Sequence, residues 1–245
     1  MTMELEATTF GEVWQEVFTT QPAPPDWLVI VSGGVALAVV LTGAPWRIAR
    51  NVVTIAHEGG HALVAVLCGR QLSGIRLHSD TSGVTVSRGR PDGIGMILTV
   101  AAGYITPSLV GLGGILLLLA NRITALLWIS ILLLLTMLLL IRNVYGVISV
   151  VGTGALVFLV SWFLPSEVQA AFAYAFTWFL LFAGVRPVFE LQSQRRRQPA
   201  GTGQSDADQL ARLTGAPGTL WVGFFLVVNL AVLALGVWLL VLAEL

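Results

Sequence analysis

His57, Glu58 and His61 are the residues of this sequence best suited to metal chemistry. They belong to the run His-Glu-Gly-Gly-His, and residues four apart lie on the same face of a helix, so His57 and His61 can direct both imidazoles at one metal ion. Glu58 can then accept a proton from a water molecule that the ion holds. The spacing therefore predicts a zinc site that catalyses hydrolysis.

The stretch that contains this motif, residues 46–68, is otherwise apolar enough to cross a membrane. His57 lies about 16 Å along a helix from Trp46, near the middle of a hydrocarbon core ~30 Å thick. Ionisable side chains at that depth are unfavourable unless they serve a function. These residues favour an intramembrane metalloprotease, and a buried hydrogen-bonded cluster between helices is the structural alternative.

The composition is that of a polytopic membrane protein, with 56% hydrophobic residues, 11% charged residues and a mean hydropathy of +0.85. These values exclude a soluble globular domain and a disordered chain. The 13 basic residues, all of them arginine, balance 13 acidic residues, so nucleic-acid binding has no electrostatic support. The single cysteine, Cys68, has no partner for an internal disulfide.

Apolar runs predict an all-α polytopic membrane protein with about seven transmembrane helices. The predicted spans are residues 27–43, 46–68, 93–119, 123–141, 144–163, 168–185 and 219–243. They form one domain, residues 27–245, in which the polar stretch 192–218 is a cytoplasmic linker that includes a short helix capped by Ser205. The acidic segment 1–26 is compatible with an amphipathic surface helix or with a frayed terminus, and it lacks the positive charge of a cleavable signal.

The arginines orient this seven-span arrangement, because basic residues collect on the cytoplasmic side of a membrane. With the amino terminus in the cytoplasm, only Arg47, Arg50 and Arg122 face outside and the other arginines face the cytoplasm. The carboxyl terminus then lies outside. We therefore expect an integral membrane protein with a cytoplasmic amino terminus.

The segment between the second and third spans has the pattern of a β-hairpin within residues 72–88. Apolar and polar residues alternate over 75–78 and 84–87, on either side of a glycine-containing turn at 79–83. An exposed edge of such a hairpin near the metal could hold an extended peptide by strand addition. The alternative is an ordinary cytoplasmic loop.

The histidine motif needs a third protein ligand, because a catalytic zinc usually has three and keeps a fourth position open. The candidates are His78, Asp80, Asp92, Glu190, Asp206 and Asp208. Asp206 and Asp208 precede a span that could pack beside the motif helix. Acidic residues in the first turn of a helix also stabilise the helix dipole without touching a metal, so the residues alone leave this choice open.

The motif inside a span, the hairpin after it and the run Ala101-Ala102-Gly103-Tyr104 resemble the site-2 protease family of intramembrane zinc metallopeptidases. The closest resemblance is to its compact bacterial B-type branch, whose carboxy-terminal segment is similar to residues 205–215. The resemblance extends over most of the chain from Trp46 onward. It implies a location in the bacterial cell membrane.

The resemblance also implies one Zn²⁺ per chain, held by His57, His61 and an aspartate. In the wider family this aspartate belongs to a Leu-Asp-Gly motif, which the present sequence lacks. Its position late in the chain, beside a final core helix, selects Asp206 as the metal ligand, with Asp208 in reserve. Glu58 is the implied catalytic residue.

The implied function is that of a zinc metalloendopeptidase that cleaves peptide bonds in or near transmembrane segments, using zinc-bound water that Glu58 activates. Its partners are then a membrane-protein substrate and the lipid bilayer, and nucleic acid is not among them. Two alternatives are a catalytically silent metal-binding membrane scaffold and a metal-ion transporter. Asn143 and Asn229 could bind the substrate backbone or the oxyanion, although packing between helices is the commoner role of such amides.

Overall fold

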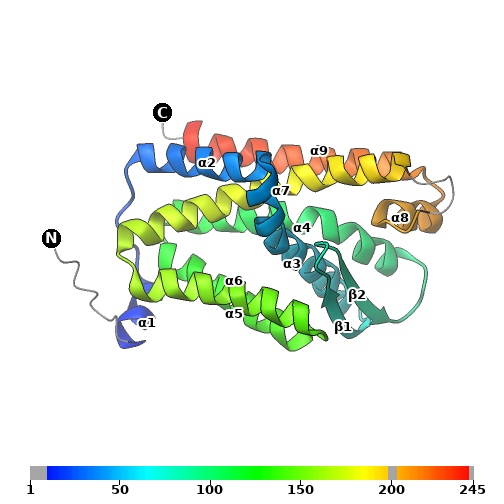
Figure 1. Ribbon diagram of the computed structural model, residues 1–245, viewed down its shortest axis with the longest axis horizontal. Helices are drawn as coiled ribbons and strands as arrows, with labels where there is room; N and C mark the ends of the chain where they lie inside the picture. The colour runs from blue at the N-terminus through cyan, green and yellow to red at the C-terminus, as the bar shows by residue number, and fades with distance from the viewer. Residues whose placement is uncertain (1–9, 198–202, 243–245) are drawn as a thin grey trace.

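Long apolar helices account for most of the chain, as its hydrophobic runs predict. The computed structural model describes residues 10–197 and 203–242 (Figure 1). Its helices and strands are α1 (Phe10–Phe18), α2 (Asp26–Leu41), α3 (Gly43–Leu67), β1 (Gln71–Leu77), β2 (Gly83–Arg88), α4 (Ile94–Leu119), α5 (Ile123–Leu140), α6 (Val144–Phe163), α7 (Ser166–Arg197), α8 (Asp206–Thr214), α9 (Gly218–Val237) and the π-helical η1 (Trp238–Leu242). A helical bundle with one small hairpin agrees with the predicted fold class.

The number of membrane spans differs from the prediction. Among the described residues, five helices are long and apolar enough to cross a membrane: α4, α5, α6, α7 and α9 with most of η1. The helices α2 and α3 pass this test only as a pair, and they are bent by 100° where they meet. The structure therefore has five candidate spans, or six if the bent pair is one broken span, and the predicted seven are not confirmed.

The break between α2 and α3 has a local cause. Thr42 adopts an extended conformation, with φ −87° and ψ 149°, so the helical hydrogen-bond ladder stops there. A new helix begins at Gly43 and carries Pro45 in its first turn, where a missing backbone N–H removes no hydrogen bond. Two predicted spans thus become one bent pair.

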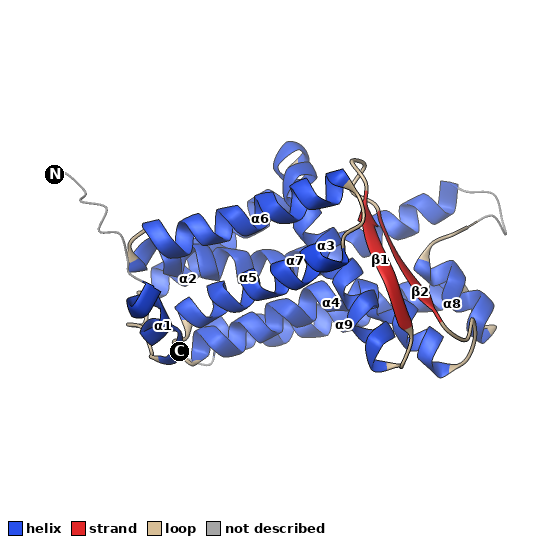
Figure 2. Cartoon of the chain, turned by 90° about the horizontal axis from the view of Figure 1, so that it is seen from below, coloured by secondary structure: helices blue, strands red, loops and turns tan. Residues whose placement is uncertain are grey.

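The bent pair bears on where the first and last described helices lie. The first described helix, α1, and the last described segment, η1, lie at the same end of the bundle (Figure 1), whereas seven spans would place the termini at opposite ends. The hairpin and α8 lie at the other end, and this arrangement is also clear in Figure 2. The prediction of termini on opposite sides depended on two full spans where the structure has one bent pair.

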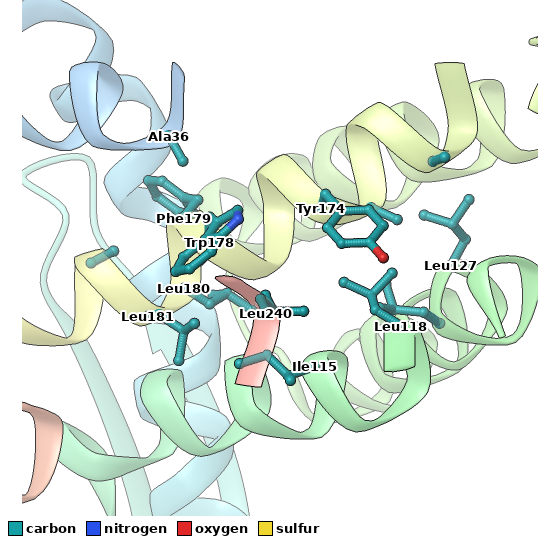
Figure 3. Packing of buried hydrophobic residues seen from close by; sticks show 14 of the residues in the cluster. Ala36, Ile115, Leu118, Leu127, Tyr174, Trp178, Phe179, Leu180, Leu181 and Leu240 are labelled. Carbon is teal, nitrogen blue, oxygen red and sulfur yellow. The ribbon is translucent and has the colours of Figure 1, made fainter. Parts of the chain in front are cut away.

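The helix α7 runs through the centre of the main hydrophobic core. Figure 3 shows Trp178 and Leu181 of this helix among buried side chains from α2, α4 and η1. A Cβ added at Gly33 of α2 would lie 3.3 Å from the Trp178 indole, and one at Gly111 of α4 would lie 3.0 Å from Leu181. Small residues therefore let α2 and α4 pack closely on α7, as is usual between helices in membranes.

The predicted hairpin is present, and one of its edges is covered. β1 and β2 are antiparallel, and the outer edge of β1 meets the corner between α5 and α6. There the Arg142 N–H donates to the Ile75 carbonyl at 2.8 Å, and the Asn143 amide donates to the Leu77 carbonyl at 2.7 Å. Among the described residues, β2 has no third strand on its outer edge.

The polar segments 1–26 and 192–218 both contain helical residues. Residues 10–18 of the acidic segment form α1, with Trp14 and Phe18 exposed, and residues 1–9 lie outside the described part. The helix α7 continues to Arg197, so the expected linker starts later than residue 192. Ser205 caps α8 with a complete capping box, as its position predicts.

Candidate metal centre

The helix α3 brings the two motif histidines together. His57 and His61 are one helical turn apart, their rings are edge to face with centroids 4.7 Å apart, and their Nε2 atoms are separated by 3.1 Å. Both side chains are largely covered, with 20% and 11% of their surfaces exposed. The spacing in the sequence thus produces the pair of imidazole nitrogens that it predicts.

Asp206 reaches this pair from the other end of the sequence. It is the first residue of α8, and its Oδ2 lies 3.2 Å from His57 Nε2 and 3.3 Å from His61 Nε2. These three side chains are the one group of His, Cys, Asp or Glu residues found in the described chain that could hold a metal ion. The structure therefore brings together His57, His61 and Asp206.

The donor set fits zinc. The three ligand atoms form a nearly equilateral triangle with edges of 3.1, 3.2 and 3.3 Å. Ligands that bind tetrahedral zinc at 2.0–2.1 Å are separated by about 3.3 Å, so the triangle matches one face of such a tetrahedron. Asp206 Oδ2 is also buried and accepts no hydrogen bond from the described residues, which is unfavourable unless a cation satisfies it.

A neighbouring carbonyl selects the tautomer of His61. Its Nδ1 lies 2.7 Å from the carbonyl oxygen of Thr99 in α4. A carbonyl can only accept, so Nδ1 carries a proton and donates it, and Nε2 is the nitrogen that faces Asp206 and can bind a metal. The same hydrogen bond fixes the orientation of the ring.

The helix α4 approaches the histidines at a glycine. A Cβ added at Gly103 would collide with His61 Nε2 and would lie 2.7 Å from His57 Cε1. The next residue, Tyr104, is edge to face with His57 at 4.8 Å and stacks on Phe225 of α9 at 5.0 Å. In the sequence, Gly103 and Tyr104 belong to the run 101–104 that carries the family resemblance, and nothing in that run marks them as neighbours of the histidines.

The Glu58 side chain contacts the hairpin strand β2. Only 3% of its surface is exposed, and its Oε2 accepts a hydrogen bond from the Thr85 hydroxyl of β2 at 2.6 Å. A Cβ added at Gly83 would lie 2.5 Å from Glu58 Oε1, so β2 packs directly on the carboxylate. Sequence reasoning gave no role to Thr85, because nothing in a single threonine marks it as the neighbour of a distant glutamate.

Asp208, the reserve ligand, has another role. Its Oδ1 accepts from Arg195 Nε at 2.8 Å, and its Oδ2 accepts from the Ser205 hydroxyl at 2.6 Å and from the Ser205 backbone N–H of the capping box at 3.3 Å. Burial raises the pKa of Asp208, but the bonds from Ser205 and Arg195 lower it further, to below its ordinary value. Asp208 therefore holds the start of α8 in place and leaves Asp206 free to face the histidines.

The carboxyl group of Asp206 is kept as an anion. Burial raises its pKa, yet the imidazoles of His61 and His57 lower it further, and the result is a pKa below the ordinary value. An ionised carboxylate is the form that binds a metal cation.

The remaining candidates in the hairpin turn and after it lie outside this group. Asp80 accepts from the Ser82 hydroxyl at 2.6 Å, and the hydrogen bonds from Ser82 lower the pKa of Asp80. His78 Nδ1 lies 3.3 Å from the same hydroxyl, and Asp92 pairs with Arg90 at 3.7 Å on the surface. These residues shape the hairpin turn and the loop before α4.

Glu190 of α7 is engaged in other contacts, which lie near the break between α2 and α3. It accepts from the Trp46 indole at 2.9 Å and from Arg186 Nε at 3.1 Å, and it pairs with Arg50 at 3.3 Å. The Arg186 guanidinium lies over the Trp46 ring at 4.6 Å. This cluster ties α7 to the start of α3, so Glu190 acts in positioning the motif helix.

The two asparagines considered for substrate binding are engaged in packing. Asn143 binds the backbone of Leu77 in both directions, at 2.7 and 3.2 Å. Asn229 is fully buried, and its amide donates to the carbonyls of Tyr104 and Phe225 at 3.0 and 2.7 Å. Neither amide is available to a substrate in this structure.

Comparison with known proteins gives one match. The family model described as Peptidase M50B-like matches residues 30–236, which include α3, the hairpin, α4 and α8. Searches of curated proteins and of solved structures gave no match.

Proposed function

Since the chain belongs to the Peptidase M50B-like family, we propose that it is a zinc metalloendopeptidase that cleaves peptide bonds in or near the transmembrane segments of membrane proteins. The family and the apolar helices together make it an integral membrane protein of a metallopeptidase family. The observation that carries the proposal is the triangle of His57, His61 and Asp206, with Glu58 as the residue that follows His57 in α3. Two of the metal ligands and the base thus lie within about one turn of α3, and α8 supplies the third ligand.

His57, His61 and Asp206 would hold one Zn²⁺ per chain. When bound, such an ion lowers the pKa of a water molecule and polarises a peptide carbonyl. Glu58 takes a proton from the attacking water as the new C–O bond forms, and it delivers that proton to the amide nitrogen as the C–N bond breaks. The products are a carboxylate and an amine, so no further reactant is needed.

The substrate segment is proposed to bind as an extended strand, because a helix hides its peptide bonds in its own hydrogen bonds. The outer edge of β1 is covered by residues 141–143, which leaves the outer edge of β2 for strand addition. Thr85 and Gly83 of β2 contact Glu58. A peptide on this edge would therefore lie next to the base.

The distribution of arginine supports an orientation in a bacterial cell membrane. The end with the hairpin and α8 carries Arg70, Arg76, Arg88, Arg90, Arg142, Arg195, Arg196, Arg197 and Arg212, and Arg122 lies at the opposite end. Basic residues collect on the cytoplasmic side, so the α8 end is proposed to face the cytoplasm. With the bent pair as one span, α1 and η1 then lie outside. This proposal replaces the expectation of a cytoplasmic amino terminus.

Zinc content and cleavage can be measured on the same preparation. Wild type purified in detergent is expected to hold about one zinc per chain and to cleave some members of a library of quenched fluorescent peptides, each with an apolar segment of about 20 residues. Glu58→Gln should hold zinc and not cleave. Zinc without cleavage in wild type would favour the silent scaffold, whereas cleavage by Glu58→Gln would exclude the proposed mechanism.

A further inference from the structure

The Glu58 carboxylate has one hydrogen-bond donor among the described residues, the Thr85 hydroxyl. The distance from Thr85 Oγ1 to Glu58 Oε2 is 2.6 Å, and the same hydroxyl lies 3.1 Å from the Glu58 carbonyl oxygen. A hydroxyl that donates to an ionised carboxylate makes a charge-assisted bond, about twice as strong as a neutral one. The bond joins α3 to a strand 27 residues further along the chain.

The strand β2 also limits where the carboxylate can move. Gly83 packs against the second oxygen so closely that an added Cβ would lie 2.5 Å from Oε1. With 3% of Glu58 exposed, its side chain is enclosed between α3 and β2. One strand thus contacts both oxygens of the base.

The position of Thr85 is set by contacts that do not involve the metal ligands. Thr85 is opposite Ile75 in the hairpin, and the Ile75 carbonyl accepts from Arg142 at the corner between α5 and α6. The hairpin turn is tied to α3 by the Thr54 hydroxyl, which donates to the Thr81 carbonyl at 2.8 Å. The histidines, in contrast, contact α4 and α8. Two separate sets of contacts therefore fix the metal ligands and the base.

We propose that Thr85 is a positioning residue for the general base, holding the Glu58 carboxylate in the orientation required for proton transfer. The inference rests on the proposed function. A glutamate side chain has several rotatable bonds, and a proton acceptor must come within about 2.6–3.2 Å of its donor. A displacement of about 1 Å in such a group can reduce the rate about 100-fold. Thr85 also links the base to the strand on which the peptide is proposed to bind.

The test compares two substitutions of one residue in the full-length, zinc-loaded protein. Thr85→Val keeps the shape and removes the donor, and Thr85→Ser keeps the donor. With a cleaved fluorescent peptide from the library as probe, we expect Thr85→Val to lower kcat about 10- to 100-fold, with KM and zinc content within about twofold of wild type. Thr85→Ser should restore kcat to within about threefold. Thr136→Val, which removes a hydroxyl on the exposed side of α5, is the matched control.

An infrared measurement tests the contact without hydrolysis. The difference spectrum between wild type and Glu58→Gln isolates the carboxylate stretch of Glu58, and this band should shift in Thr85→Val but not in Thr85→Ser or Thr136→Val. An unshifted band, a wild-type kcat in Thr85→Val, or loss of zinc in that variant would each overturn the positioning role. If wild type cleaves no peptide, the proposed function fails and the positioning role of Thr85 in catalysis fails with it. The infrared band still shows whether Thr85 binds the Glu58 carboxylate.

Discussion

The two chemical groups of the α3 motif depend on different parts of the fold. The histidines are held by helices, since α4 supplies the Thr99 carbonyl and α8 supplies Asp206. Glu58 is held by a hairpin strand through Thr85. Neighbouring residues on one helix are thus held by different segments. A mutation should therefore be able to remove proton transfer without removing the metal.

The two supports also differ in how they are anchored. On the metal side, α8 is fixed by the capping box of Ser205 and Asp208 and by the ion pair from Asp208 to Arg195 of α7. On the base side, the hairpin is fixed by hydrogen bonds to the backbone of β1 from residues 142 and 143. Substitutions on the base side should therefore leave zinc binding unchanged, whereas loss of the metal should also stop cleavage.

The largest effect is expected from the removal of the third ligand. Asp206→Ala leaves two imidazoles, too few for a stable zinc site, so zinc should fall from about one per chain to below about 0.1 and cleavage should be lost. Elemental analysis of dialysed protein measures this. Asp92→Ala, which removes an exposed carboxylate, is the control and should keep its zinc. Full zinc in Asp206→Ala would exclude this residue as a ligand.

The next largest effect is expected from removal of the base, and it separates proton transfer from metal binding. Glu58→Gln removes the base and keeps the side-chain size, so the hydrolytic rate should fall about 10²- to 10⁴-fold. Zinc content should stay at the wild-type level, because Glu58 is not one of the three gathered ligand atoms. Parallel assays of peptide cleavage and zinc would show this, and a joint loss of both would mean that the two sides are not independent.

A smaller effect is expected where α4 meets the histidines. Gly103→Ala places a methyl group against His61 and His57, and the displaced rings should bind zinc about 10- to 100-fold more weakly, the range seen for disturbed outer contacts of metal sites. Competition with a chelator gives the affinity. Gly113→Ala on the same helix, where nothing lies within 4 Å, should bind zinc as wild type does. Equal affinities in the two variants would contradict the close contact.

The smallest effect concerns the anchor of α8. Asp208→Ala removes the capping bond and the pair with Arg195, worth about 0.5–2 kcal/mol at a helix start, so the zinc affinity should fall by about threefold to tenfold. The same chelator competition detects it. If Asp208→Ala lost zinc more completely than Asp206→Ala, the assignment of the ligand would move to Asp208.

Part of this site could be predicted from local sequence. The pair of imidazoles follows from the period of a helix, and the hairpin follows from alternation around a glycine-containing turn. Both depend on neighbours in the chain, so a single sequence contains them. The family, inferred from the motif and the segments after it, is confirmed by the match over residues 30–236.

Contacts between distant segments could not be predicted in this way. The break at Thr42 turned two predicted spans into one bent pair, because hydropathy measures the polarity of a run and not its direction. Asp206 and Asp208 have the same side chain and lie two positions apart in the sequence, so residue type does not distinguish them. One faces the histidines and the other faces Arg195, because the capping box fixes how α8 is rotated.

Local sequence therefore set the chemical groups of the candidate site: two imidazoles and a carboxylate on one helical turn, within a chain apolar enough for a membrane. The packing of the segments decided which of the two candidate aspartates faces the histidines, which hydroxyl binds Glu58 and which edge of the hairpin is covered. The physical reason is range. Helical period and hydropathy act between neighbours, whereas ligand geometry depends on packing between segments separated by more than a hundred residues.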